Sequence, residues 1–269
     1  MNEEEQFDAV LEELRALLLA FGDLASHVVL IGGQVLALYD RQAGGRGNTK
    51  LETETGVAVE RGFSYEPDLV VDVDNAGHGV DLLFDVLRER HYAPVRGFRW
   101  AKTLASGQEV HLDFFVPGDA EAPPAGFTKL AGSDLALAKT ERVTIAVHGG
   151  TLDVAVPDAA GFIASKIAAR PLRREESNKH KDLFDVWGYV MLRGVSVVAD
   201  SFARSPARDS LIEDMRALFR SAEADGPKDV VAFVGVDDDE TKALLAQAVV
   251  DTIQRLIHEV EVRRGARGR

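Results

Sequence analysis

The chain has 269 residues, of which 46% are hydrophobic and 28% are charged, and this balance predicts a soluble globular protein with one large domain or two ordinary ones. It contains no cysteine, which excludes disulfides, thiolate catalysis and cysteine-ligated zinc, so any metal must be held by oxygen or imidazole. The formal net charge of -13 argues against a broad electrostatic contact with nucleic acid and leaves only a local basic site. Because no apolar run of about eighteen residues occurs and the N-terminus reads MNEEEQ, we expect no membrane span, no signal peptide and a cytoplasmic location.

The first segments of the chain predict a helix, a strand and a second helix. Residues 3–21 place apolar side chains at three- and four-residue spacing, which is typical of an amphipathic helix. The run 27-HVVLIGG-33 predicts a short strand that ends in paired glycines, and residues 34–42 return to helical spacing. Residues 43–62 are rich in Gly, Thr and charge, and we interpret them as an irregular hairpin that is an insertion or a flexible loop.

The stretch 64-SYEPDLVVDVDNAG-77 predicts a strand that carries acids along one side. Acidic residues recur at even spacing, namely Glu66, Asp68, Asp72 and Asp74. Successive side chains of a strand point to opposite faces, so these acids are expected to share a face. Residues 79–92 have helical spacing and are expected to form a helix after this strand.

A second segment, 109-EVHLDFF-115, repeats the acidic pattern, because Glu109, His111 and Asp113 alternate with apolar residues. If the two strands are neighbours, their carboxylates repel one another in a partly desolvated site unless a cation compensates. Mg²⁺ prefers such hard oxygen ligands. The sequence therefore predicts a divalent metal site on this face.

The second half of the chain changes in character near residue 157. Short β-type runs at 109–117, 141–149 and 151–157 extend the predicted sheet. Beyond them the pattern is mostly helical, at 158–170, 178–194 and 239–264. We expect a mixed-sheet α/β domain over residues 1–157 and a helical domain over residues 158–269.

The order of 28-VVLIGGQVLAL-38, 64-SYEPDLVVDV-73 and 110-VHLDFFVP-117 resembles the nucleotidyltransferase fold of polymerase-beta-type enzymes, in which a hydrophobic strand ending in Gly-Gly or Gly-Ser precedes Asp-x-Asp and a third acid. The later segments 139-KTERVTIAV-147, 162-FIASKIAAR-170 and 179-KHKDLFDVW-187 resemble the AbiEii-type nucleotidyltransferase-like group, which is known as the toxins of type IV toxin-antitoxin systems.

This resemblance implies a polymerase-beta-like mixed sheet with helices, followed by a C-terminal helical domain that closes over a nucleotide cleft. It implies transfer of a nucleoside monophosphate from a nucleoside triphosphate to an acceptor hydroxyl, with Mg²⁺ or Mn²⁺ as cofactor. The acceptor implied most sharply is the 3′ end of tRNA. A cognate antitoxin protein is the implied partner of such a toxin.

The resemblance also implies roles for individual residues. Those of the first domain are the glycine motif at Gly32 and Gly33, the metal-binding pair Glu66 and Asp68, and a third acid, Asp113, which completes the metal cluster and assists the nucleophile. In the second domain, Lys166 matches the lysine near the nucleotide phosphates and Asp182 matches the later acid, and these two would position nucleotide and acceptor.

The sequence departs from the family pattern at two points. Glu66 stands where the first metal-binding Asp is usual, and residues 43–62 lengthen the interval between Gly33 and Glu66. An alternative register takes Asp72 and Asp74 as the metal pair, although Asp74 is better placed to cap the following turn or helix.

Other interpretations of the same residues stay open at this point. The acids could line a solvated sheet face, and Gly32 with Gly33 could form a simple turn. Lys166 could be a snorkelling surface lysine, and Asp182 an acid favoured at a helix start.

Two further functions also stay open. One is nucleotidylation of a small molecule or a protein hydroxyl, and the other is a catalytically silent nucleotide-binding or interaction module. The most basic local cluster is Arg170, Arg173, Arg174, Lys179 and Lys181. It could contact nucleotide phosphates or an RNA end, or it could merely balance nearby acids such as Glu175 and Glu176.

Overall fold

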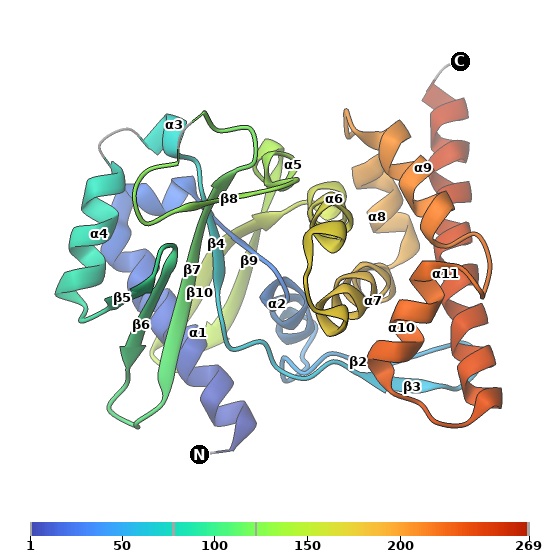
Figure 1. Cartoon of the computed structure of the whole chain (residues 1–269), viewed down its shortest axis with the longest axis horizontal. Helices are drawn as coiled ribbons and strands as arrows, with labels where there is room; N and C mark the ends of the chain where they lie inside the picture. The colour runs from blue at the N-terminus through green and yellow to red at the C-terminus, as the bar shows by residue number, and fades with distance from the viewer. Residues whose placement is uncertain (1, 77–78, 122, 268–269) are drawn as a thin grey trace. The chain divides into compact units, whose positions relative to one another are not determined.

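The computed structural model describes residues 2–76, 79–121 and 123–267, and it divides the chain into two compact units (Figure 1). Unit 1 comprises Met1–Asn48 and Gly62–Pro157, and unit 2 comprises Thr49–Arg61 and Asp158–Arg269. None of the helices in these described ranges is long and apolar enough to span a bilayer.

Unit 1 is built on one mixed sheet, which has eight strands in the part of the chain that the structure describes. The strands are β1 (Val28–Ile31), β4 (Asp68–Val71), β5 (Ala93–Arg96), β6 (Arg99–Thr103), β7 (Glu109–Pro117), β8 (Thr128–Leu130), β9 (Thr140–Val147) and β10 (Gly150–Pro157). Their order across the sheet is β5-β6-β7-β4-β1-β10-β9, with β8 beside β7. The pairs β1/β10, β4/β7 and β7/β8 are parallel, and the other pairs are antiparallel. The predicted mixed α/β fold is therefore confirmed.

The longer helices of unit 1 lie where the apolar spacing of the sequence predicted helices. The helices of this unit are α1 (Glu3–Phe21), the 3-10 turn η1 (Gly22–His27), α2 (Gln34–Gln42), α3 (Val73–Ala76), α4 (Gly79–Glu89) and α5 (Ser133–Ala138). Helix α1 begins with a capping box, in which the Asn2 side chain accepts from the backbone of Glu5 and the Glu5 side chain accepts from the backbone of Asn2. The predicted helices at 3–21 and 34–42 are confirmed, and the one at 79–92 ends at Glu89.

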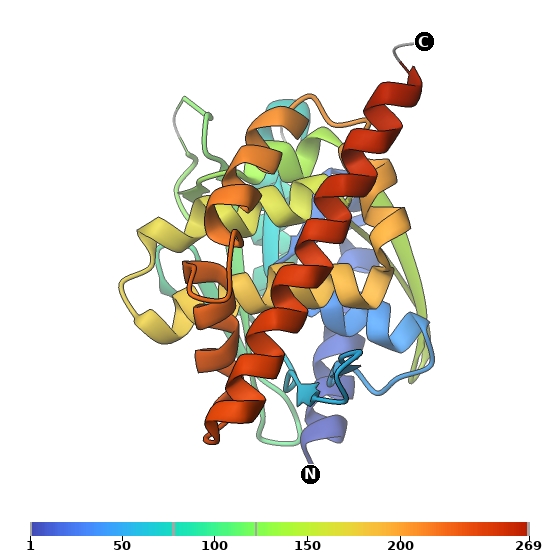
Figure 2. The same cartoon turned by 90° about the vertical axis from the view of Figure 1, so that its right-hand side faces the viewer.

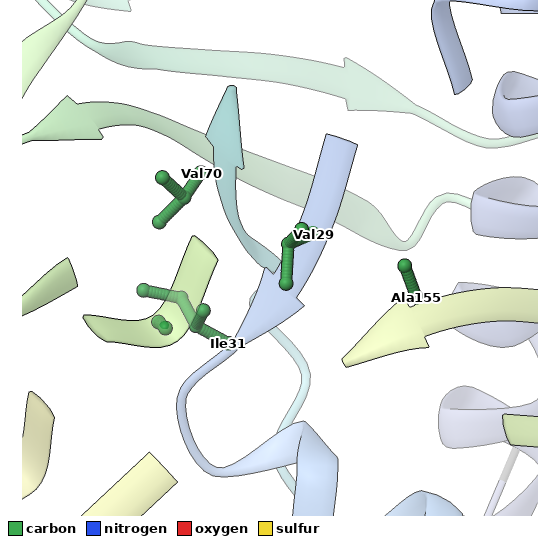
Figure 3. Packing of buried hydrophobic residues seen from close by; sticks show 5 residues of the cluster. Val29, Ile31, Val70 and Ala155 are labelled. Atoms are coloured by element: carbon green, nitrogen blue, oxygen red, sulfur yellow. The ribbon is translucent and has the colours of Figure 1, made fainter. Parts of the chain in front are cut away.

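The core of the sheet contains a compact cluster of small and branched side chains. Val29, Ile31, Val70 and Ala155 come from three adjacent strands, and Ala136 of α5 packs among them (Figure 3). β-branched residues suit this position because they fill the pleated surface with little loss of side-chain freedom.

The candidate acids lie on the same face of the sheet as this cluster. Asp68 is two residues before the buried Val70, and Asp113 is two residues before Phe115, which packs against the cluster. Because side chains two residues apart in a strand point to the same face, the acids extend that face beyond the apolar core.

The strand predicted over residues 64–77 is much shorter than expected. β4 covers only Asp68–Val71. The Asp72 carboxylate accepts a hydrogen bond from the backbone N–H of Asn75 at 3.2 Å and starts α3, in whose first turn Asp74 lies. The expectation that four acids share one strand face is therefore wrong. The alternative pair Asp72 and Asp74 belongs to a helix start, and Gly77 lies outside the described residues.

Unit 2 combines a small hairpin with a bundle of helices. The hairpin pairs β2 (Lys50–Glu52) with β3 (Ala58–Glu60). The helices are α6 (Ala159–Ala169), η2 (Arg170–Leu172), α7 (Glu176–Arg193), α8 (Val195–Phe202), α9 (Arg208–Leu218), α10 (Asp225–Val234) and α11 (Asp239–Arg267). Helix α11 crosses the bundle and packs on α8 and α10 (Figure 2). The predicted helices near 158–170, 178–194 and 239–264 are confirmed, whereas α8, α9 and α10 were not predicted.

The hairpin contacts α7 and belongs to unit 2. The interpretation of residues 43–62 as an irregular hairpin is therefore correct for β2 and β3. Their interpretation as a flexible insertion in the first domain is not, because Arg61, at the end of the hairpin, is buried in unit 2.

Candidate functional site

The acid-bearing strands β4 and β7 are neighbours, which is the condition on which the predicted metal site depended. Asp68 and Asp113 are direct register partners on these two parallel strands. On the other side of β7, Arg99 of β6 is the antiparallel partner of Asp113. Direct partners point to the same face of a sheet, so two carboxylates and a guanidinium lie in one row with Asp113 in the middle.

Arg99 binds both oxygens of the central carboxylate. Its Nε donates to Oδ1 of Asp113 at 2.7 Å, and its Nη2 donates to Oδ2 at 2.7 Å. The Asp113 side chain is only 7% exposed and that of Arg99 only 17%. A bidentate pair of this kind is among the stronger polar contacts in proteins. The hydrogen bond to Asp113, helped by the charges of Asp113 and Glu66, raises the pKa of Arg99 despite its partial burial.

Glu66 adds a third carboxylate at the edge of this row. It precedes β4 and is about half exposed, and its Oε2 accepts from Nη2 of Arg99 at 2.9 Å. Its Oε1 lies 3.2 Å from Nδ1 of His111, whose Nε2 lies 3.2 Å from Glu109. Partial burial opposes ionisation of Glu66, but the hydrogen bond from His111 and the charge of Arg99 outweigh it and lower the pKa of Glu66.

The glycine turn lies directly against Asp68. Gly32 has φ +76°, in the left-handed region, and Gly33 precedes the first turn of α2. A Cβ added at Gly32 would overlap the Oδ2 atom of Asp68. Glycine is therefore required at this position twice, once for its backbone angle and once for the close approach of the carboxylate.

The expected metal ligands Glu66, Asp68 and Asp113 do not form a metal site in this arrangement. Among the residues that the structure describes, no group of three or more His, Asp or Glu side chains could hold a metal ion. The reason is visible in the contacts, because both oxygens of Asp113 accept from Arg99 and Glu66 turns toward Arg99 and His111. The acidic row is balanced by a guanidinium, and the side chains as they stand do not fit Mg²⁺ or Mn²⁺.

The two candidate residues of the helical part, Lys166 and Asp182, lie together in the interior of unit 2. The Nζ atom of Lys166 donates to Asp182 at 3.2 Å and to Asp185 at 2.6 Å. The Lys166 side chain is 7% exposed, so it is not a snorkelling surface lysine. Arg173 donates to the other oxygen of Asp182 at 2.7 Å. The charges of Lys166 and Asp182 are thus satisfied within unit 2.

Asp185 and Arg61 complete this buried ion network. The Nε atom of Arg61 donates to Oδ1 of Asp185 at 2.6 Å, and both side chains are nearly inaccessible. Burial opposes ionisation of Asp185, but the charges of Arg61 and Lys166 outweigh it and lower the pKa of Asp185 well below its usual range. Burial likewise opposes protonation of Lys166, and the charges of Asp185 and Asp182 reverse that effect and raise its pKa. Asp185 and Lys166 therefore both remain charged at neutral pH.

Sequence reasoning missed Arg99, Arg61 and Asp185. A signal for Arg99 was present, because 99-RWAKT-103 and 109-EVHLDFF-115 flank the turn 105-ASGQ-108, and an antiparallel hairpin around it places Arg99 opposite Asp113. Arg61 pairs with a residue 124 positions further along the chain, and no local pattern predicts that contact.

Comparison with known proteins adds one structural similarity. No protein-family model matches the chain, and no curated protein matches its sequence. The crystal structure of an antigenic nucleotidyltransferase-like protein from Paracoccidioides brasiliensis aligns with 79% of this chain and 88% of its own, at 15% sequence identity and a TM-score of 0.45. A similarity at this level carries no argument about activity, so the functional argument depends on the residues described above.

Proposed function

We propose that unit 1 is a nucleotidyltransferase, which transfers a nucleoside monophosphate from a nucleoside triphosphate to an acceptor hydroxyl and releases pyrophosphate. The observation that carries this proposal is the pairing of Asp68 with Asp113 on adjacent parallel strands, directly beside the glycine turn at Gly32. A glycine turn and a helix N-terminus beside two neighbouring carboxylates support transfer of a phosphate-bearing group.

The chemistry assigns separate tasks to these groups. Backbone amides at the start of α2 would bind the phosphates, because a helix N-terminus favours an anion. The acceptor oxygen would attack the α-phosphorus as the bond to pyrophosphate breaks. Asp113, the most buried acid of the row, would accept the proton of the attacking hydroxyl. The carboxylate can do so only when it is not bound by Arg99.

We propose the 3′ end of tRNA as the acceptor to test first, with a toxin role and a cognate antitoxin protein as the wider context. Support for this finer proposal comes from the sequence resemblance alone. The net charge of -13 opposes it, and the basic cluster is partly occupied, because Arg170 pairs with Asp229 and Lys179 with Glu176. A small-molecule or protein hydroxyl is the alternative acceptor.

A catalytically silent module is the second candidate, and one observation favours it. Arg99 occupies both oxygens of Asp113, the carboxylate that would have to take up a proton. If that pair never opens, unit 1 keeps the fold without the reaction.

The test follows the label of each of the four radiolabelled nucleoside triphosphates into RNA, protein and small molecules. The full-length protein is incubated with total tRNA and either Mg²⁺ or Mn²⁺, beside Asp68→Ala. Asp85→Ala is the matched control, because Asp85 is an exposed acid of α4 in the same unit and pairs with Arg88 one helical turn away. We expect wild type and Asp85→Ala to transfer label and Asp68→Ala to lose transfer by at least about a hundredfold.

The distribution of label then decides between the candidates. Label in RNA identifies the acceptor and the nucleotide, and label in protein or in a small molecule replaces the tRNA proposal. No label in any fraction, with nucleotide binding still measurable by filter retention, favours the silent module. Equal labelling by Asp68→Ala and wild type would refute the assignment of the site.

A further inference from the structure

We propose that the guanidinium of Arg99 takes the place of a divalent cation in the acidic row of unit 1, so that the row binds metal only after Arg99 is withdrawn. This inference rests on the proposed function, because it concerns the regulation of the same site. Glu66, Asp68 and Asp113 are carboxylates of the kind that hold Mg²⁺, but their arrangement in the structure does not fit this ion. The inference follows from that disagreement.

The position of Arg99 is fixed by the backbone. Arg99 is the register partner of Asp113 in the antiparallel pair of β6 and β7, and Phe98, the residue before it, accepts a backbone hydrogen bond from Phe114 at 2.9 Å. The guanidinium therefore starts from a point directly opposite the central carboxylate. Its contact with Asp113 is built into the sheet and is not a chance pairing of two mobile surface chains.

Arg99 contacts the carboxylate oxygens that a bound cation would be expected to contact. Its N–H groups reach both oxygens of Asp113 and both oxygens of Glu66, at distances between 2.7 and 3.4 Å. One positive group thus joins two of the three expected ligands. Asp68, the third, is the cross-strand neighbour of Asp113.

The charges explain why the row needs a cation. Glu66, Asp68 and Asp113 bring three carboxylates together, and Arg99 supplies one fixed positive charge. Asp113 is nearly buried, so an uncompensated charge there is costly. If Arg99 leaves, a divalent ion is the species best suited to replace it, because it brings more charge to the same oxygens.

A triphosphate is the natural competitor for the guanidinium. Arginine binds phosphate oxygens with the same planar fork that it offers to a carboxylate. Nucleotide that draws Arg99 away would at the same time uncover Asp113. The geometry therefore predicts that metal and nucleotide bind together and that metal alone binds weakly.

The experiment measures Mn²⁺ binding to the full-length protein by electron paramagnetic resonance, without nucleotide and without a reaction. The test variant is Arg99→Gln. The control is Arg88→Gln, which removes an exposed arginine of the same unit whose partner is Asp85. We expect Arg99→Gln to bind Mn²⁺ at least about tenfold more tightly than wild type and Arg88→Gln to match wild type. The double variant Arg99→Gln with Asp113→Asn is expected to lose the gain.

A second variant and a second readout keep the test decisive if Arg99→Gln folds poorly by circular dichroism. Arg99→Lys retains the charge without the fork, and we expect an intermediate affinity. Bound Mn²⁺ is also expected to raise the melting temperature of Arg99→Gln more than that of wild type. Equal Mn²⁺ affinity in wild type and both Arg99 variants would overturn the inference, as would a gain that survives Asp113→Asn.

The Mn²⁺-binding experiment and the nucleotide-transfer experiment can fail independently of each other. Tighter Mn²⁺ binding by Arg99→Gln without nucleotide transfer by any variant would support the inference and refute the transferase. Nucleotide transfer by wild type, together with an unchanged Mn²⁺ affinity in Arg99→Gln, would support the transferase and refute the inference about Arg99.

Discussion

Gly32 meets two constraints at once, one on its backbone angle and one on the space beside it. Its φ of +76° disfavours any side chain, and its Cα lies where a methyl group would displace the Asp68 carboxylate. Gly107 has φ +85° but open space where a Cβ would lie. Alanine at Gly107 therefore tests backbone strain alone, whereas alanine at Gly32 adds the overlap with Asp68.

We expect Gly32→Ala to abolish nucleotide transfer and to lower the stability of unit 1 by more than Gly107→Ala. The left-handed backbone alone costs about 1–2 kcal/mol in either variant. The chain has two tryptophans, Trp100 in unit 1 and Trp187 in unit 2. Urea denaturation followed by ¹⁹F NMR of 5-fluorotryptophan therefore reports each unit separately. Equal effects of the two substitutions on the Trp100 signal and on transfer would show that the contact with Asp68 has no consequence.

Asp185 predicts how the stability of unit 2 depends on pH. Arg61 and Lys166 hold the pKa of this buried carboxyl below its ordinary value of 3.8. A lowered pKa in the folded state stabilises the fold above the unfolded value, and that contribution is lost as the pH falls toward the folded value. We expect the urea midpoint of the Trp187 signal to stay level between about pH 7 and pH 5 and to fall below about pH 4.

Asp185→Asn provides the matching mutational test. It leaves Arg61 and Lys166 buried beside a neutral amide, which is expected to cost about 3–5 kcal/mol at pH 7. Asp209→Asn removes an exposed carboxylate that pairs with Arg208, and we expect no measurable change. If Asp185→Asn unfolds at the wild-type urea concentration, the network contributes nothing to stability.

At the level of residues, the sequence predicted the acids better than their partners. Asp68 and Asp113 could be found because strand alternation places both on one face. Arg99 required the register of a hairpin whose first strand has no clear alternation. Asp185 lies in the quoted segment 179-KHKDLFDVW-187, but its burial depends on the packing of α6 on α7, which no local pattern specifies.

Among the structural elements, the β2–β3 hairpin departs most from its prediction. Its composition of Gly, Thr and charge suggested a flexible surface segment. Arg61 at its end is nevertheless nearly inaccessible and pairs with Asp185. Long-range ion pairs of this kind leave no periodic signal in the sequence, which is why the hairpin's packing could not be predicted.

We expect Arg61→Met to lower the stability of unit 2 by about 3–5 kcal/mol, because it leaves Asp185 buried with one cation fewer. Lys50→Met in the same hairpin breaks a pair with Glu60 in which both side chains are mostly exposed, and its effect is expected to stay within about 0.5 kcal/mol. The Trp187 resonance in urea measures both. Equal effects would mean that the hairpin is attached only loosely to the helices.

The helices and strands that were predicted correctly share strong periodicity. The apolar spacing of α1, α6, α7 and α11 and the alternation in β7, β9 and β10 were sufficient. β5 carries a proline and is exposed along its whole length, so it offers no alternation to detect. α3 consists of a single turn created by the Asp72 cap.

Over the whole chain, the change in pattern near residue 157 predicted an α/β domain followed by a helical domain, and the structure places one boundary between its two units after Pro157. The sequence did not show that the second unit also takes residues 49–61 from the first half. The chain passes from unit 1 to unit 2 after Asn48, returns after Arg61 and leaves again after Pro157.

This connectivity predicts that residues 158–269 do not fold cooperatively alone. Without the hairpin, Asp185 would be buried without Arg61, and α7 would lose its contact with β2. Fusing residues 49–61 to the fragment through a flexible linker is expected to restore a sharp urea transition in the Trp187 signal. An equally sharp transition for the bare fragment would contradict the expectation, and the fusion carrying Arg61→Met serves as the control.

The same connectivity sets an order of events on the ribosome. Arg61 leaves the exit tunnel 124 residues before Asp185, its partner in the buried pair. Domains generally fold from the N-terminus as they are synthesised, at about 5–20 residues per second. The hairpin therefore waits several seconds as an exposed loop of the growing chain. During that interval Arg61 lacks its partner, and a truncated product that ends before residue 185 never acquires it.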